Sequence, residues 1–106
     1  MESFEALIES NRDRIHDLDA AVIEIVQNRI RMVAEEQRIR IAAGMCRTDT
    51  RWEMQVITQF SKALGTPGRD IALSLLRLSD ANPHGLVTRP SGADGEPSPA
   101  GGSAGG

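Results

Sequence analysis

Proline is absent from the chain before Pro67, and no stretch shows a convincing alternation of apolar and polar residues. Proline interrupts helices and period-two alternation marks strands, so both absences favour uninterrupted helices. The single cysteine, Cys46, excludes an internal disulfide and offers no ligand spacing typical of a zinc site. No apolar run approaches the roughly 18 residues that a membrane span needs.

The chain also lacks an excess of basic residues. Its net charge is −3 at pH 7 with both signs interspersed, whereas a dedicated nucleic-acid-binding protein usually has a net basic surface. The opening residues, MESFEALIESNRDR, are acidic where a secretory signal is basic, and no apolar segment follows them. We therefore expect a cytoplasmic protein that binds neither nucleic acid nor a membrane.

The sequence divides into two parts of different composition. Residues 82–106 consist largely of Gly, Pro, Ser and Ala, and they have too few apolar residues to offset the entropy cost of ordering them. We predict a disordered tail there and a folded domain over residues 1–81. About 80 residues form a marginal core by themselves, and association with a second chain is a common remedy.

A very long helix is predicted over residues 5–43. Apolar residues recur there at three- and four-residue steps, and Gly44 is placed to end the helix. At 1.5 Å per residue it would be roughly 58 Å long, which is too long for a compact domain of this size.

Two short helices are predicted to follow, which makes the domain all-α. The first covers residues 51–64, has candidate N-cap residues at 48–50, and is stopped by the GTPG segment at residues 65–68. The second covers residues 69–79. Its expected core face consists of Ile71, Ala72, Leu75, Leu76 and Leu78.

A helix of this length cannot bury its own apolar stripe against two short helices. Two copies of the chain packed together could, so we predict a homodimer with intertwined long helices. A simple coiled-coil dimer is the alternative, but Arg29 and Glu36 interrupt the heptad pattern.

Three arginines in the long helix are candidates for binding an anion. Arg29 and Arg40 are 11 residues apart, so they point within about 20° of each other and lie roughly 16 Å apart along the axis. Arg12 lies roughly 25 Å from Arg29 and can reach the same ligand only from a partner chain. Arg29 either extends its head into water or binds an anion inside the helix bundle. Several converging arginines suggest a dicarboxylate.

The segment NRDRIHDLDAAVIEIVQNR, residues 11–29, resembles the opening of the all-helical chorismate mutase family. The resemblance continues through RIRIAAGMCRTDTRWEM and VITQFSKALGTPGRDIALSLLRLS, and the last segment is most similar to the short intracellular actinobacterial subgroup. It covers about residues 8–80. The resemblance implies an intertwined dimer that rearranges chorismate to prephenate without a cofactor or a metal.

The resemblance also implies roles for individual basic residues. Arg12 matches an arginine that reaches a substrate carboxylate from the second subunit, and Arg29 matches the arginine that binds the other carboxylate. Arg40 falls where the family has a cation close to a carboxylate and the ether oxygen, which makes it a catalytic candidate.

Three further residues match family positions that contact the substrate. Asp49 resembles a loop acid near the substrate hydroxyl. Glu53 matches a glutamate that accepts a hydrogen bond from that hydroxyl, and it is the second catalytic candidate. Ser79 falls near a serine of the last helix that touches a carboxylate.

The sequence departs from the family pattern at two positions. Trp52 occupies the place of an arginine, and neighbouring Arg51 is rotated by about 100° on the helix and does not replace it. Trp52 either packs as a buried aromatic or contacts the substrate. Pro83 falls where the family has a Gln or Glu that contacts the ether oxygen, so that contact is predicted to be missing.

These departures leave three functions open. The leading hypothesis is a chorismate mutase that is weak by itself and activated by the synthase of the first shikimate step, as the subgroup resemblance implies. The second is a mutase or pyruvate-lyase that acts on another chorismate-like substrate. The third is a catalytically dead helical dimer with a regulatory role.

Overall fold

The computed structural model describes residues 3–85, and in these residues the chain forms three α-helices and no strand. Helix α1 spans Phe4–Ala42, α2 spans Thr50–Leu64 and α3 spans Thr66–Ala81. The all-α prediction with one long and two short helices is confirmed. No helix in this part of the chain combines the length and apolar character needed to cross a membrane.

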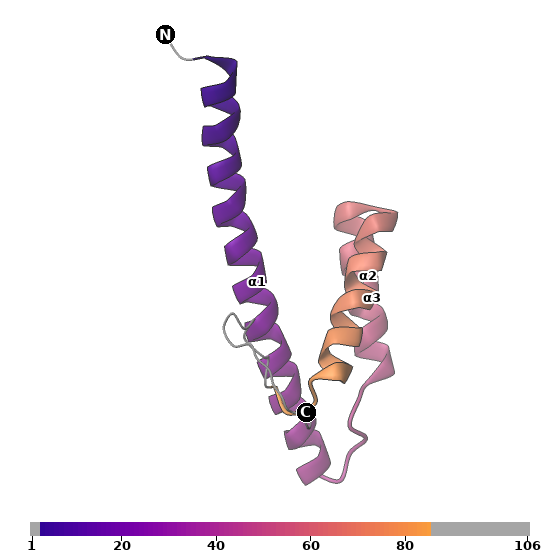
Figure 1. Ribbon diagram of the computed structural model, residues 1–106. Helices are drawn as coiled ribbons and strands as arrows, with labels where there is room; N and C mark the ends of the chain where they lie inside the picture. Colours follow the sequence, from indigo (N-terminus) through magenta and orange to yellow (C-terminus); the bar gives the residue numbers. More distant parts are fainter. Residues whose placement is uncertain (1–2, 86–106) are drawn as a thin grey trace.

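Helix α1 runs without interruption for 39 residues. Its first turn is capped by Ser3, whose side chain accepts a hydrogen bond from the backbone N–H of Ala6 at 3.0 Å. It ends where Gly44 adopts a φ of 77°, a left-handed conformation that glycine takes without steric cost. The N-terminal half of α1 extends well beyond the other two helices (Figure 1).

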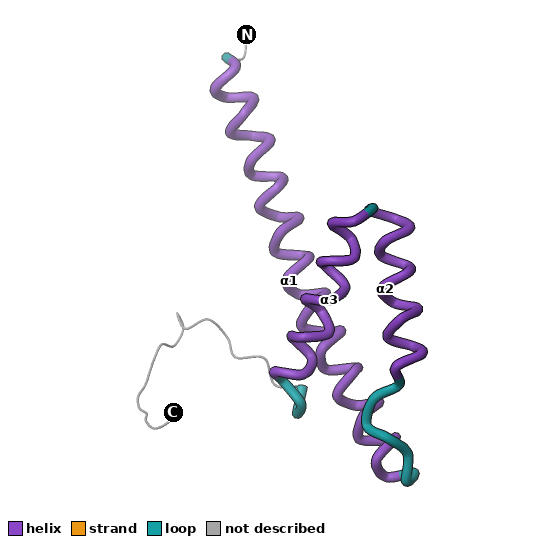
Figure 2. Tube along the Cα trace, turned by 90° about the vertical axis from the view of Figure 1, so that its right-hand side faces the viewer, coloured by secondary structure: helices purple, strands orange, loops and turns teal. Residues whose placement is uncertain are grey.

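Helices α2 and α3 lie side by side as an antiparallel pair (Figures 1 and 2). Asp49 caps α2 by accepting a hydrogen bond from the backbone N–H of Trp52. The pair approaches closely at Gly68, where a Cβ atom would lie 2.2 Å from the carbonyl oxygen of Phe60. Glycine is therefore required at this helix crossing.

The predicted start of the third helix was wrong by one turn. We expected GTPG to form a connection up to residue 69, but Gly65 is the only residue between α2 and α3. Pro67 lies in the first turn of α3, where its missing N–H would have had no helical partner in any case. Pro67 thus belongs to the start of α3 and not to the connection between α2 and α3.

The core of the single chain is thin. Its buried apolar residues are Ile30, Ala34, Val56, Ala72 and Leu75. Leu75 and Ala72 belong to the face expected for the third helix, but Ile71 and Leu78 of that face remain more than two-fifths exposed. They are exposed because, among the described residues, α1 packs against α3 over only a short stretch.

The stretch after α3 returns to α1. Gly85 is buried there with a φ of 74°, and a Cβ atom on it would lie 3.2 Å from the Cβ of Ala34 and from the Cα of Arg31. Residues 82–85 are thus part of the folded unit. The remainder of the segment predicted as a disordered tail, residues 86–106, lies outside the described residues.

Candidate active site

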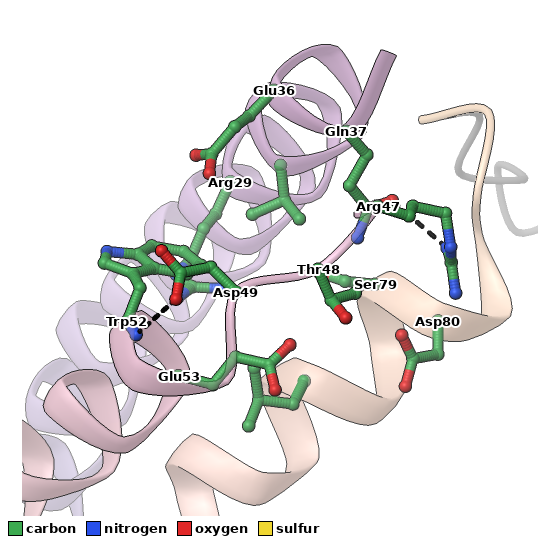
Figure 3. Close-up of a pocket in the computed structure, with 12 residues that line it drawn as sticks. Arg29, Glu36, Gln37, Arg47, Thr48, Asp49, Trp52, Glu53, Ser79 and Asp80 are labelled. Atoms are coloured by element: carbon green, nitrogen blue, oxygen red, sulfur yellow. Dashed lines mark hydrogen bonds between the residues drawn. The ribbon is translucent and has the colours of Figure 1, made fainter. Parts of the chain in front are cut away.

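One pocket lies where the C-terminal half of α1, the loop after it, the start of α2 and the end of α3 come together (Figure 3). The space that it encloses in the single chain is narrow, about 20 Å³, which is room for roughly one water molecule. Its lining residues are Arg29, Val33, Glu36, Gln37, Arg47, Thr48, Asp49, Trp52, Glu53, Leu76, Ser79 and Asp80. Five predicted site residues therefore share one cavity: Arg29, Asp49, Trp52, Glu53 and Ser79.

Arg29 enters the pocket from α1 and is partly withdrawn from water. The Trp52 ring lies against its guanidinium, with 5.8 Å between Cζ and the ring centroid. Among the described residues, Nη1 of Arg29 is buried and has no hydrogen-bond partner. Desolvation by burial lowers the pKa of this guanidinium from its ordinary value. A desolvated cation with a free donor is suited to binding an anion.

Asp49 and Glu53 stand one helical turn apart at the start of α2. One Asp49 oxygen, Oδ1, accepts the capping hydrogen bond from the Trp52 N–H at 3.3 Å, and the other, Oδ2, lies 3.9 Å from Nη1 of Arg40. Glu53 projects toward the middle of the pocket in Figure 3. Asp49 therefore holds the helix start in place while also lining the cavity.

Arg40 lies beside the pocket and is not part of its lining. Its Nε donates a hydrogen bond to the carbonyl oxygen of Cys46 at 2.7 Å, and its guanidinium approaches Asp49. In the single chain Arg40 therefore stabilises the loop between α1 and α2 from outside the pocket. The catalytic role that the resemblance implies for it stays a prediction.

Ser79 brings a hydroxyl into the pocket from α3. The residue is only 5% exposed, and among the described residues its Oγ has no hydrogen-bond partner. A buried hydroxyl without a partner is costly, so a ligand group that bonded to it would remove that cost.

Arg12 lies far from this pocket in the single chain. It is exposed on the projecting half of α1, 17 residues before Arg29, which corresponds to roughly 25 Å along a continuous helix. The structure of one chain thus does not bring Arg12 into the site. Any contribution from this residue has to come from another copy.

Sequence reasoning missed several lining residues, of which Gln37 and Arg47 are the most informative. Gln37 is buried, and it shares a helix face with Arg29 and Val33 because the three are spaced four residues apart. That spacing was the available signal for Gln37. Arg47 lies in the loop, where no periodic pattern indicates which way a side chain points.

The lining as a whole carries more acidic than basic groups. Arg29 and Arg47 are the basic residues, and Glu36, Asp49, Glu53 and Asp80 are the acidic ones. In residues 3–85, no group of three or more His, Cys, Asp or Glu side chains is placed to hold a metal ion. The fold and the pocket thus define an all-helical protein with a site for a small polar ligand, in which Arg29 and Ser79 carry the buried groups without a partner among the described residues.

Comparison with known proteins narrows this class. The chain is 38% identical over 71 residues to the intracellular chorismate mutase of Mycolicibacterium smegmatis, covering 67% of this chain and 68% of that protein. It is 37% identical over 71 residues to the proteins of the same name from Mycobacterium bovis and Mycobacterium tuberculosis, covering 67% of each chain. No family model and no solved structure matches it. The chain belongs to the intracellular chorismate mutase family, a family of isomerases, as the resemblance predicted.

Proposed function

We propose that this protein rearranges chorismate to prephenate in the pocket around Arg29. The observation that carries the proposal is the arginine pocket in a chain 37–38% identical to proteins named intracellular chorismate mutase. The reaction is a [3,3] shift in which a C–O bond breaks as a C–C bond forms, so it requires no covalent intermediate and no cofactor. The relatives' designation as intracellular supports a cytoplasmic location.

The pocket can assist such a reaction in two ways. It can hold the flexible dianion in the compact conformation that reacts. The two carbon atoms that form the new bond then lie close together before the reaction begins. It can also stabilise the negative charge that develops on the ether oxygen as the C–O bond breaks. We assign the first task to Arg29, Asp49, Glu53 and Ser79, and the second to Arg40. In this assignment Glu53 accepts a hydrogen bond from the substrate hydroxyl.

Arg40 can take up this role only if its guanidinium turns into the cavity. It now contacts the Cys46 carbonyl and Asp49, both of which belong to the loop that borders the pocket. A substrate that brought a carboxylate or its ether oxygen close to Arg40 would compete with Asp49 for the guanidinium. Release of that contact would leave the guanidinium available to the ether oxygen.

We further propose that the site is completed by Arg12 from a second copy of the chain. The pocket of one chain has four carboxylates against two arginines, which is a poor environment for a dianion. A large apolar surface of the same chain also remains uncovered along α1. A homodimer would cover that surface and bring further positive charge to the pocket. The catalytic domain in this proposal consists of residues 1–81.

Low activity of the isolated protein is expected from two positions. Trp52 places a ring over Arg29 and contributes no cation. Pro83 follows the end of α3 at Ala81, so no helical side chain is available to contact the ether oxygen from there. Loss of one such contact costs on the order of 2.7–4 kcal/mol of barrier. A partner such as the first shikimate-pathway synthase would then be needed for full activity.

The contact between Trp52 and Arg29 also favours a second candidate function. A ring at this place narrows the cavity beside the anion-binding arginine, which suits a mutase or pyruvate-lyase with another chorismate-like substrate. A dead regulatory dimer is disfavoured, because a structural protein gains nothing from a buried guanidinium without a partner.

One assay separates these possibilities. The purified protein is incubated with chorismate, the loss of chorismate absorbance is followed, and the product is identified by chromatography. We expect prephenate, at a rate that rises when the first-step synthase is added. Release of pyruvate would support the lyase, and no turnover of chorismate with or without the synthase would contradict the proposed chorismate mutase activity.

A further inference from the structure

Arg47 is the second basic residue that lines the pocket. It lies in the loop between α1 and α2. Figure 3 shows it beside Gln37, on the side of the pocket away from Trp52. Gln37 follows Arg29 by eight residues on α1, which corresponds to roughly 12 Å along the helix axis. The two arginines therefore stand at opposite ends of the cavity.

A buried amide holds the Arg47 guanidinium at this end. Nη1 of Arg47 donates a hydrogen bond to Oε1 of Gln37 at 3.3 Å, and Gln37 is only 8% exposed. A guanidinium has five N–H donors, so this bond leaves most of them available. Among the described residues, no carboxylate lies within the 4.0 Å of an ion pair with Arg47, although Asp80 lines the same pocket.

The adjacent α3 supplies the second observation. Ser79 is buried, its Oγ has no hydrogen-bond partner among the described residues, and it lines the same cavity as Gln37 and Arg47. A carboxylate seated there would accept hydrogen bonds from the hydroxyl and from the free donors of Arg47. This is the kind of ligand that a planar guanidinium binds best.

The start of α2 supplies no competing cation. Trp52 is uncharged, and Arg51 lines a separate surface groove together with Met54, Gln55 and Lys62. Arg40 contacts the loop and does not line the cavity. Figure 3 shows Arg47 on the Ser79 side of the pocket, whereas Arg29 lies on the Trp52 side.

We propose that Arg47, positioned by Gln37, binds a carboxylate of the substrate at the Ser79 end of the pocket. This assignment rests on the proposed function, because it takes chorismate and prephenate as the ligands. Arg47 is a binding residue and Gln37 is a positioning residue that acts through it.

The test compares Arg47→Ala and Arg47→Lys with Arg51→Ala in the full chain. Arg51 is a matched control because it is an exposed arginine four residues away that does not line the pocket. We expect Arg47→Ala to raise the KM for chorismate about tenfold or more, with a smaller change in kcat, and Arg47→Lys to recover part of the loss. Arg51→Ala should stay within about twofold of the wild type.

Binding is measured independently of turnover through Trp52, the only tryptophan of the chain, which lines the pocket. Titration with prephenate should change its fluorescence. The Kd should increase about tenfold in Arg47→Ala, and it should be unchanged in Arg51→Ala. Circular dichroism of each variant verifies the fold, and Arg47→Gln serves as a second variant if Arg47→Ala is unfolded.

Gln37→Met tests the positioning role. It removes the amide and keeps the side-chain length, so we expect a several-fold increase in KM. In the Gln37→Met, Arg47→Ala double variant the KM should equal that of Arg47→Ala, because Gln37 acts only through Arg47. Additive effects of the two substitutions would contradict this coupling.

The outcomes distinguish the two proposals. If Arg47→Ala and Arg51→Ala both keep wild-type KM and Kd, Arg47 is a surface charge and the assignment is wrong, while the proposed function stands. If the wild type neither binds prephenate nor converts chorismate, the proposed function is wrong and the assignment falls with it.

Discussion

Arg29 shows how a single charged residue in an apolar helix face is tolerated. Its guanidinium lies against the Trp52 ring, and burial lowers its pKa because the charged form loses hydration. Arginine titrates far above neutral pH, so the lowered pKa still leaves Arg29 charged there. The Arg29 guanidinium therefore remains charged in the pocket although it has lost part of its hydration. A bound anion would offset this loss.

We expect Arg29→Ala to reduce kcat/KM for chorismate by on the order of 10²- to 10³-fold, because it removes the desolvated cation from the pocket. Steady-state kinetics provide the measurement. Arg38→Ala is the matched control, because Arg38 lies on the same helix in an exposed ion pair with Glu35 and such pairs contribute little. Equal activity of Arg29→Ala and Arg38→Ala would show that the reaction takes place elsewhere.

Asp49 combines two roles that substitutions can separate. Asp49→Ala removes the N-cap of α2, which should lower the free energy of unfolding by about 0.5–2 kcal/mol. Asp49→Asn keeps a capping acceptor and should unfold at nearly the wild-type urea concentration. If the carboxylate also takes part in substrate binding, both variants should lose activity. Full activity of Asp49→Asn would restrict Asp49 to its structural role.

At the scale of the elements, the close approach of α2 and α3 depends on one glycine. A Cβ at Gly68 would lie 2.2 Å from the Phe60 carbonyl oxygen and 2.8 Å from the Leu64 Cβ, and backbone atoms cannot yield as a flexible side chain can. The crossing is therefore more sensitive to a single methyl group than the rest of the helix pair.

We expect Gly68→Ala to lower the free energy of unfolding by about 3 kcal/mol or more, because the helices must separate to admit the methyl group. Gly44→Ala is the matched control, since Gly44 has a φ of 77° with nothing within 4 Å of a Cβ. It should cost about 1–2 kcal/mol for the left-handed conformation alone. Urea unfolding of both variants at equal protein concentration measures the difference. Equal costs would mean that the crossing relaxes easily.

The helices were predictable from the sequence to different degrees. The spacing of apolar residues and the position of Gly44 predicted the long helix to within a residue at each end. The start of α3 was not predictable from Pro67 by itself, because proline both ends helices and begins them. Only packing against α2, made possible by Gly68, decides that a single residue separates α2 and α3.

The site was predictable only where a residue type has a matching position in known relatives. Arg29, Glu53 and Ser79, to which the resemblance assigned roles, line one cavity, and the roles themselves stay predictions. Arg47 was missed because the conformation of a loop determines where its side chain lies. Gln37 was missed because it is a polar residue on the face of α1 that the sequence predicted to be apolar. Arg40 shows the converse, since it has the expected position along α1 yet contacts the loop in this chain.

At the scale of the whole molecule, the single chain leaves its longest helix largely uncovered. The exposed large apolar residues in residues 4–25 of α1 are Phe4, Leu7, Ile8, Ile15, Leu18, Val22, Ile23 and Ile25. Full burial of one such Leu or Ile side chain contributes about 1.5–3 kcal/mol. Another groove of the same chain, lined by Ile25, Met32, Ile39 and Trp52, is open beside the pocket. A second copy could cover both surfaces and place its Arg12 near the first copy's Arg29.

Mixing two inactive variants tests this arrangement. Arg12→Ala and Arg29→Ala should each be inactive as homodimers, because every site lacks one arginine. In a heterodimer, the Arg29 of one chain meets the Arg12 of the other at one site, and both substitutions fall in the second site. Random pairing makes half of all dimers mixed, so co-expression in equal amounts should restore about a quarter of the wild-type activity.

A chain that carries both substitutions provides the control, because its co-expression with either single variant regenerates no intact site. Sedimentation must show dimers of the same mass for every variant, because a lost interface would otherwise be mistaken for a lost site. Recovery of activity in the mixture alone requires two chains to contribute to one cavity. Absence of recovery from verified mixed dimers would mean that Arg12 does not act across the interface, and the charge balance of the pocket would then have to come from Arg40 and Arg47 of the same chain.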